Sequence, residues 1–241
     1  MRTIVIGDTH GCFNELKDLI LTLEESGEYN KYTDKLIFLG DYIDRGDDSR
    51  LVVSYIRTLQ KNNDKVIALM GNHEDMLLNY IDGKDEWWLH NGHDATLESY
   101  VGFYNQFLSD IEWMRNLPLY HEDEHFIYVH AGINTSKPME EQRRDILLWT
   151  REEFIYDYKE YNKKVIFGHT PTANLNGTWK PIYTDTHNVD IDTGCVYGGA
   201  LTALIIDDDK INGFYQMPKE KEEKKEDIFE DGYEQLNLYN Y

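Results

Sequence analysis

The sequence has little cysteine, few basic residues relative to acidic ones, and no long apolar run. Cys12 and Cys195 are its only cysteines; we expect reduced thiols, with a disulfide between the two as the less favoured alternative. The 24 Lys and Arg residues against 45 Asp and Glu residues give a net charge of −21. This excess of acid argues against general binding of nucleic acid or of anionic membranes, because both present negative phosphates.

The length and composition predict one large domain. An apolar fraction of 41% is typical of a globular chain, and 241 residues suffice for an α/β domain with a full core. No apolar run approaches the length of a membrane span, and the opening Met1-Arg2-Thr3-Ile4 leaves no room for a secretion signal. We therefore expect a cytoplasmic protein. Residues 218–241 begin with a run of charge that predicts a solvated helix or a disordered tail.

Three apolar runs in the first 70 residues each end in a glycine followed by Asp or Asn. The loops that follow them are Gly7-Asp8-Thr9-His10-Gly11, Gly40-Asp41-Tyr42-Ile43-Asp44-Arg45-Gly46 and Gly71-Asn72-His73-Glu74. In an α/β sheet the carboxyl ends of the strands open into the crevice where ligands bind. Carboxylates that converge there repel one another and lose hydration unless cations lie between them. Oxygen and imidazole ligands without thiolate suit manganese, iron or zinc.

The rest of the chain predicts a two-sheet core flanked by helices. Strand and helix alternate over the first 80 residues, which predicts a βαβαβ arrangement, and residues 82–124 predict a helical lobe beside the site. Two further strands end in His130-Ala131-Gly132 and in Gly168-His169-Thr170-Pro171. Residues 188–192, 200–207 and 210–216 predict antiparallel strands of a second sheet.

These five strand-end motifs, in this order and spacing, resemble the phosphoprotein phosphatase family of metallophosphoesterases, over about residues 1–216. His130-Ala131-Gly132 and Asn91-Gly92-His93 are more similar to the prokaryotic and phage branches than to the eukaryotic ones. The resemblance implies an α/β fold with a two-sheet β-sandwich core in four layers (αββα). It also implies a catalytic domain over residues 1–217, with the helical lobe at 82–124.

The same resemblance implies a role for each matching residue. The six metal ligands would be Asp8, His10, Asp41, Asn72, His130 and His169. Asp41 would bridge two divalent cations, for which we expect manganese, with iron or zinc as alternatives. His73 would be the general acid and Asp44 would orient it. Arg45 would bind the substrate phosphate, and Arg151, in Trp149-Thr150-Arg151, resembles a second phosphate-binding arginine.

The first functional hypothesis is therefore hydrolysis of phosphoserine and phosphothreonine monoesters in proteins, by a hydroxide that bridges the two metals. Two metals about 3.5–4 Å apart can activate water and clamp phosphoryl oxygens for in-line attack. The main alternative is symmetrical hydrolysis of diadenosine tetraphosphate or a related nucleotide, because bacterial hydrolases of that type share these motifs. A catalytically silent binding protein of the same fold is a third, less favoured hypothesis.

For Cys195 and for the aromatic segment 87–100, packing in the core is a sufficient interpretation or an open alternative. Cys195 is predicted to pack as a small apolar residue. The aromatic segment 87–100 would either line the substrate rim or pack in the core.

Overall fold

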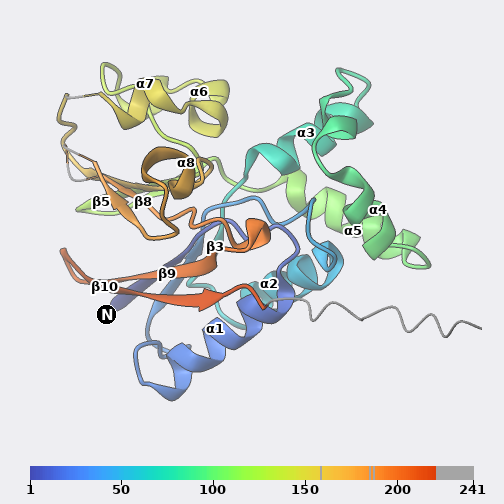
Figure 1. Ribbon diagram of the computed structural model, residues 1–241, viewed down its shortest axis with the longest axis horizontal. Coiled ribbons are helices and arrows are strands. Elements are labelled where there is room, and N and C mark those ends of the chain that lie inside the picture. The colour runs from blue at the N-terminus through green and yellow to red at the C-terminus, as the bar shows by residue number, and fades with distance from the viewer. Residues whose placement is uncertain (158, 185, 187, 221–241) are drawn as a thin grey trace, which may run out of the picture.

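The computed structural model describes residues 1–220 except 158, 185 and 187, so the predicted tail beyond residue 220 lies outside the described residues. Two five-stranded sheets lie at its centre (Figure 1). The first sheet consists of β1 (Arg2–Ile6), β2 (Lys35–Phe38), β3 (Val66–Ala68), β9 (Ala200–Asp207) and β10 (Lys210–Pro218). The second consists of β4 (Tyr120–Glu122), β5 (Phe126–Val129), β6 (Lys164–Phe167), β7 (Ile182–Tyr183) and β8 (Val189–Asp190).

Helices cover the outer faces of both sheets. The α-helices are α1 (Phe13–Glu25), α2 (Ser49–Asn62), α3 (Asn72–Ile81), α4 (His93–Ser99), α5 (Tyr104–Arg115), α6 (Arg144–Trp149), α7 (Glu152–Ile155) and α8 (Thr172–Asn176). Short 3-10 helices are η1 (Trp87–His90), η2 (Met139–Glu141) and η3 (Cys195–Tyr197). In Figure 1, α1 lies below the first sheet and α6 and α7 lie above the second.

Alternation along the strands builds three apolar layers. On β1, Ile4 and Ile6 pack in the cluster that contains the buried side chains of α1 and α2, while Val5 packs between the two sheets. On β5 and β6, Phe126 and Ile166 face Val5 in the inter-sheet cluster. The opposite face of the second sheet packs on residues of α6 and α7. The order helix, sheet, sheet, helix confirms the predicted fold class.

The predicted sheet membership of the last strands is wrong. Residues 200–207 and 210–216 were expected in the second sheet, but β9 pairs antiparallel with β1, and β10 pairs with β9. All but the last residue of β9 is buried, because Leu204 faces the other sheet and Ile205 faces the helices. A strand that is apolar on both faces suits the interior of either sheet, so its pattern does not specify which one. Only β8, from segment 188–192, joins the second sheet, and it runs parallel to β6.

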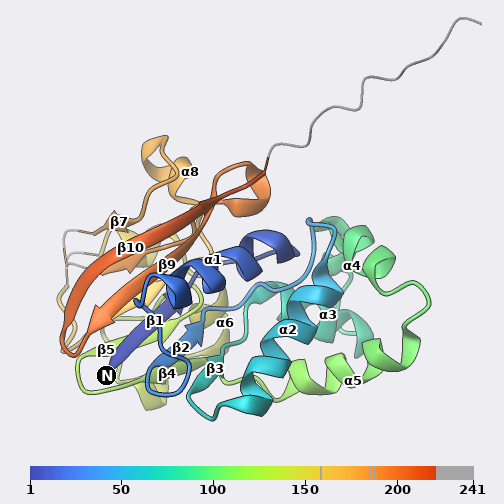
Figure 2. The same ribbon diagram turned by 90° about the horizontal axis from the view of Figure 1, so that it is seen from below.

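The segment 82–124 contains η1, α4 and α5, and its last residues form the edge strand β4. Figure 2 shows α2, α3, α4 and α5 grouped beyond β3. The contacts between α2 and α4 and between α3 and η1 join this segment to the helices that follow the loops after β2 and β3. No helix in the described part of the chain is long and apolar enough to cross a membrane.

Two glycines let the loops after β2 and β3 approach each other closely. Gly40 has φ +107°, and a Cβ added to it would lie 2.5 Å from the backbone nitrogen of Gly71. Both the positive φ and the contact with backbone exclude a side chain there. The close approach places Asp41 next to Asn72.

We predict that Gly40→Ala destabilises the protein by about 3 kcal/mol or more, because it adds a backbone clash to the strain of a positive φ. Gly27 is the matched control, since it has φ +75° and no atom within 4 Å of an added Cβ. Gly27→Ala should cost only about 1 kcal/mol. Urea unfolding of both variants measures the difference. Equal losses would contradict the proposed close approach.

Candidate active site

All ten residues singled out in the sequence lie in one connected group. The loops that carry them follow β1, β2, β3, β5 and β6, except that Arg151 lies between α6 and α7. Asp8 accepts a hydrogen bond from the backbone N–H of His169 at 3.0 Å, although 161 positions separate the two residues. The predicted convergence of strand-end loops is therefore what the structure shows; the chemical role of each residue remains a prediction.

Asp41 lies at the centre of this group and is 2% exposed. His10 Nε2 is 3.3 Å from one carboxylate oxygen, and His130 Nε2 is 3.4 Å from the other. Two sets of potential ligand atoms, each within 4.8 Å of one another, both include Asp41. The sets are His10, Asp41 and His73, and Asp41, His130 and His169. The first set contains His73, the expected general acid, and lacks Asp8, the expected ligand. Asp41 is thus placed to serve two cations at once.

The contacts of His130 fit a bound cation. Its Nδ1 is 3.0 Å from the carbonyl oxygen of Leu39, and its Nε2 is 2.8 Å from Asn72 Oδ1. Burial lowers the pKa of His130 to about 4, so the ring is neutral near pH 7 and has one N–H for two facing oxygens. The ring nitrogen without a hydrogen therefore faces an oxygen, and the lone pairs of the two atoms repel each other. A cation between Nε2 and the oxygens of Asp41 and Asn72 would be coordinated by all of them and would remove this repulsion.

Two further atoms point to the same conclusion. Asp8 Oδ1 and His169 Nε2 are buried and have no hydrogen-bond partner among the described residues. Burial, followed by the charges of Asp192 and Asp41, raises the pKa of Asp8 well above its usual value. Buried polar atoms are normally paired, and converging carboxylates need positive charge. The donor set of carboxylates, an amide and imidazoles therefore fits divalent cations.

The imidazole ring of His73 is held in place by the carboxylate of Asp44. Its Nδ1 is 2.7 Å from Asp44 Oδ2. The indole N–H of Trp88 donates to both oxygens of Asp44 at 3.0 Å, and the hydroxyl of Thr96 donates to Oδ1 at 2.6 Å. Asp44 is fully buried, so these bonds fix its orientation and that of the His73 ring. The sequence analysis missed Trp88 and Thr96 as supports of Asp44.

Of the two arrangements considered for the aromatic segment 87–100, the structure shows core packing, through Trp88. Trp88 is 2% exposed and packs in the core, whereas Trp87 is 64% exposed. Neither ring lines the cavity that opens beside Asp41 and His73.

Backbone strain is concentrated in these loops. Six non-glycine residues in the described chain have positive φ, and five of them belong to the predicted site: His10, Asp41, Asp44, Arg45 and His169. Such conformations cost about 1–3 kcal/mol each and persist where the surroundings hold them. The strained backbone therefore lowers the stability of the fold, but it sets the directions in which these side chains point.

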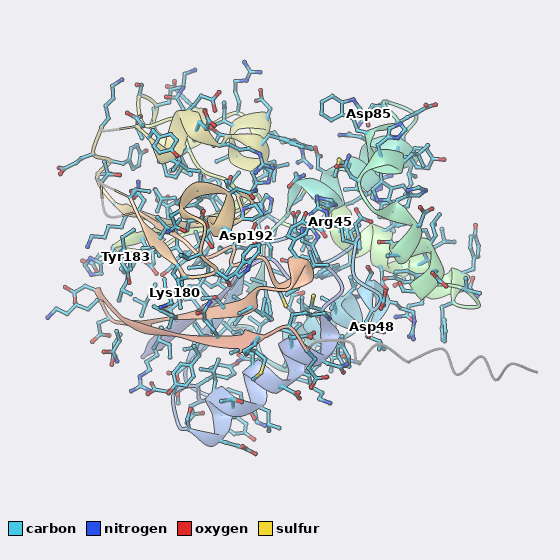
Figure 3. All side chains as sticks on the ribbon, in the orientation of Figure 1. Arg45, Asp48, Asp85, Lys180, Tyr183 and Asp192 are labelled. Carbon is cyan, nitrogen blue, oxygen red and sulfur yellow. The ribbon has the colours of Figure 1, made fainter. Side chains whose placement is uncertain are left out.

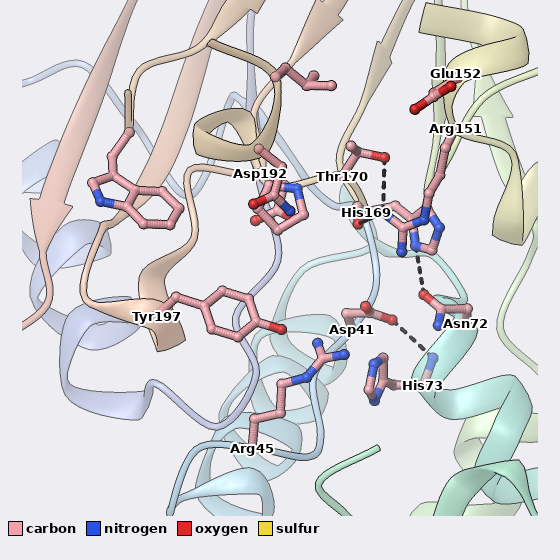
Figure 4. A pocket seen from close by; sticks show the side chains of 14 residues that line it. Asp41, Arg45, Asn72, His73, Arg151, Glu152, His169, Thr170, Asp192 and Tyr197 are labelled. Carbon is pink, nitrogen blue, oxygen red and sulfur yellow. Dashed lines mark hydrogen bonds between the residues drawn. The ribbon is translucent and has the colours of Figure 1, made fainter. Parts of the chain in front are cut away.

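A cavity of about 690 Å³ opens beside Asp41 and His73 (Figure 4). Arg45 enters it with its guanidinium 2.6 Å from His10 Nε2 and 5.5 Å from the ring centre of Tyr197. Arg151 Nη1 donates to the carbonyl oxygen of His169 and to Thr170 Oγ1. Two guanidinium groups thus flank the cluster, where they can bind an anion bidentately.

Asp192 and Glu74 belong to the site although the sequence did not assign them. Figure 3 shows Asp192 and Arg45 near the centre of the molecule, and Asp192 lines the cavity. Burial raises its pKa to about 6. Glu74 is fully buried and accepts the backbone N–H groups of Asp41 and Gly71 through Oε2 and of Tyr42 through Oε1. A glutamate at the third position of α3 is a capping signal that could have indicated this role.

The sequence model of calcineurin-like phosphoesterases matches residues 1–190, most of the chain. The chain belongs to this family. The predicted resemblance to metallophosphoesterases is confirmed, and the protein is a phosphoester hydrolase by family. Its members use pairs of divalent metals, which agrees with the candidate centre around Asp41.

Two relatives of this phosphoesterase carry the same name, asymmetrical bis(5′-nucleosyl)-tetraphosphatase PrpE. The one from Anoxybacillus flavithermus is 30% identical over 232 residues, covering 83% of this chain and 88% of that one. The one from Bacillus cereus is 29% identical over 234 residues, covering 85% and 90%.

Solved structures support the fold. A protein described as a candidate diadenosine tetraphosphatase has a TM-score of 0.65 at 21% identity, covering 90% of this chain and 93% of that one. A protein serine/threonine phosphatase from Saccharomyces cerevisiae has a TM-score of 0.58 at 16% identity, covering 92% and 80%. At these identities the likeness concerns the fold alone.

We predict that Glu74→Gln destabilises the metal-free protein by about 1–3 kcal/mol. The substituted amide presents an NH₂ group where the carboxylate accepts backbone N–H groups, so at least one buried donor loses its acceptor. Glu112→Gln is the control, because that side chain is 73% exposed and should change stability by less than about 0.5 kcal/mol. Thermal unfolding in the presence of a chelator measures both. A Glu74→Gln variant as stable as the control would exclude this role.

Proposed function

We propose that this phosphoesterase hydrolyses bis(5′-nucleosyl) tetraphosphates, using two divalent cations held around Asp41. The observation that carries the proposal is the lining of the cavity, where two arginines beside Asp41 are accompanied by two aromatic side chains: Arg45, Arg151, Trp179 and Tyr197. The name shared by the two relatives supports this substrate class. The relatives are named for asymmetrical cleavage, which yields a nucleoside triphosphate and a monophosphate, so we propose this outcome in place of the symmetrical one.

The proposed metal ligands divide into two groups. Asp8, His10 and Asp41 would hold one cation, and Asp41, Asn72, His130 and His169 the other. Two cations at this position supply Lewis-acid activation of the phosphoryl group and of water, and manganese, iron or zinc suits the ligands. The arrangement of Asp41 between two histidines supports this division.

The remaining residues would act on the substrate directly. Arg45 and Arg151 would donate hydrogen bonds to phosphoryl oxygens. These hydrogen bonds would strengthen as negative charge accumulates on the oxygens during the reaction. His73 would donate a proton to the leaving oxygen as general acid. Burial lowers the pKa of His73, while the neighbouring Asp41 and Asp44 oppose that effect and favour its proton.

We predict that Asp41→Asn weakens binding of both cations by more than about tenfold, because both sets share this carboxylate. His73→Asn should bind both cations normally and lower kcat by about 10²–10⁴-fold, since it removes only the proton donor. Metal analysis after dialysis and steady-state kinetics measure the two effects. Loss of metal in His73→Asn with retention in Asp41→Asn would refute the assignment.

The outer part of the cavity suits a nucleoside. Trp179 and Tyr197 line it together with the apolar side chains of Pro171 and Leu175. Tyr197 is 51% exposed and lies against Arg45. The Trp179 ring packs on the backbone of Gly194, where a Cβ would lie 2.1 Å from it, so the indole is held in place. Aromatic faces beside a phosphate site can stack with a base.

A phosphoserine or phosphothreonine side chain is the second candidate substrate. The metal cluster would serve it equally, and the fold is shared with a serine/threonine phosphatase. An assay of diadenosine tetraphosphate beside a phosphoserine peptide, with manganese supplied, separates the two. Turnover of the peptide alone would refute the first proposal, and turnover of neither substrate nor of an aryl phosphate would indicate a silent binding protein.

We predict that Tyr197→Leu raises KM for diadenosine tetraphosphate by about tenfold, because stacking with a base contributes about 1–3 kcal/mol. Tyr197→Phe keeps the ring and should change KM by less than about threefold. The inhibition constant of inorganic phosphate reports the phosphate site separately and should stay within about twofold in both variants. If Tyr197→Leu raised KM for diadenosine tetraphosphate and the inhibition constant of phosphate equally, the residue would act through Arg45 and not on a base.

A further inference from the structure

A second cluster of potential metal ligands lies beside the catalytic loops. Cys12 follows the loop that carries Asp8 and His10, Glu15 is in the first turn of α1, and Cys195 begins η3. One ligand atom from each lies within 4.8 Å of the other two. The three residues are buried, with exposures of 1%, 3% and 2%. None of them lines the main cavity.

Glu15 provides an observation that packing of small apolar thiols does not explain. Its Oε1 accepts the backbone N–H of Glu220 and pairs with the ammonium of Lys219 at 3.1 Å. Its Oε2 is buried and has no hydrogen-bond partner among the described residues. An unpaired carboxylate oxygen next to two thiols is costly unless something binds it.

We propose that Cys12, Glu15 and Cys195 bind a thiophilic divalent cation, with zinc as the best fit, at a structural site separate from the catalytic centre. Zinc binds thiolates and carboxylates in a tetrahedral arrangement, and with these three protein ligands the fourth position would be taken by water. Thiolates about 2.3 Å from zinc lie about 3.8 Å apart, which is within the 4.8 Å span of the cluster. The site offers three protein ligands from the described chain.

This occupant satisfies charge balance, as does the empty site with both thiols protonated. Binding releases the two thiol protons to solvent and leaves two thiolates and one carboxylate, three negative charges in all. A divalent cation and the Lys219 ammonium supply three positive charges. The filled site is therefore neutral, which a buried site requires. Lys219 is one-third exposed, and its ammonium contacts Glu15 at 3.1 Å.

The proposed ion would join two segments that form the active site. Cys12 is two residues after His10, and Cys195 is two residues before Tyr197. An ion between them would fix the first catalytic loop relative to η3, and so the distance from the metal cluster to the aromatic part of the cavity.

Cobalt(II) distinguishes this site from the catalytic one. The chain has only these two cysteines, and the catalytic ligands include no thiol, so a thiolate-to-cobalt charge-transfer band reports the proposed site alone. We expect the reduced, metal-free protein to develop this band on titration with cobalt and to lose it on addition of zinc. Cys195→Ser should lose the band while it still binds cobalt at the catalytic centre.

Asp41→Asn is the reciprocal control, and it should keep the band while it loses catalytic cobalt. Zinc should also raise the Tm of Asp41→Asn, and this rise should disappear when Cys195→Ser is added to it. No charge-transfer band in reduced wild-type protein would overturn the proposal, even if the catalytic centre binds cobalt. A band that survives in Cys195→Ser would overturn it as well.

Discussion

The structure depends on the burial of like charges around Asp41. Asp8, Asp41 and Asp192 are all nearly inaccessible to water, and the neutral imidazole of His130 cannot balance them. Buried carboxylates are tolerated when they are paired or coordinate a cation. The fold positions them at the ends of strands from both sheets, where each backbone is fixed by its neighbours. The same constraint explains the strained backbone of these loops, since an unstrained loop would let the charges separate.

Two buried acids with no proposed contact to the cations keep this arrangement in place. Glu74 binds the backbone of the loop after β2 to the start of α3, so that Asp41 and Asn72 keep a fixed separation. Asp44 connects His73 to Trp88 and Thr96, in the helical segment that follows α3. The helical segment thereby helps to fix the position of the His73 ring, although it lines none of the cavity.

The sequence predicted the centre of the site better than its surroundings. Asp8, Asp41 and Asn72 could be found because each follows a glycine at the end of an apolar strand, which is a local signal. Trp88 and Thr96 could not, because their contact with Asp44 spans 44 and 52 positions and leaves no pattern. The α/β class followed from strand and helix alternation, and the four-layer order followed from the resemblance to the metallophosphoesterases. The place of β9 did not, because burial on both faces is compatible with either sheet.

The pairing of β1 with β9 has a consequence for folding. Ile4 pairs with Ile205, so the first strand acquires one of its two neighbours only when nearly the whole domain is available. Such long-range pairing raises contact order and slows folding. A nascent chain on the ribosome cannot complete the central sheet before β9 emerges, and the loop after β1 stays without its final support. Truncation before β9 therefore removes one neighbour of the strand that leads into Asp8 and His10.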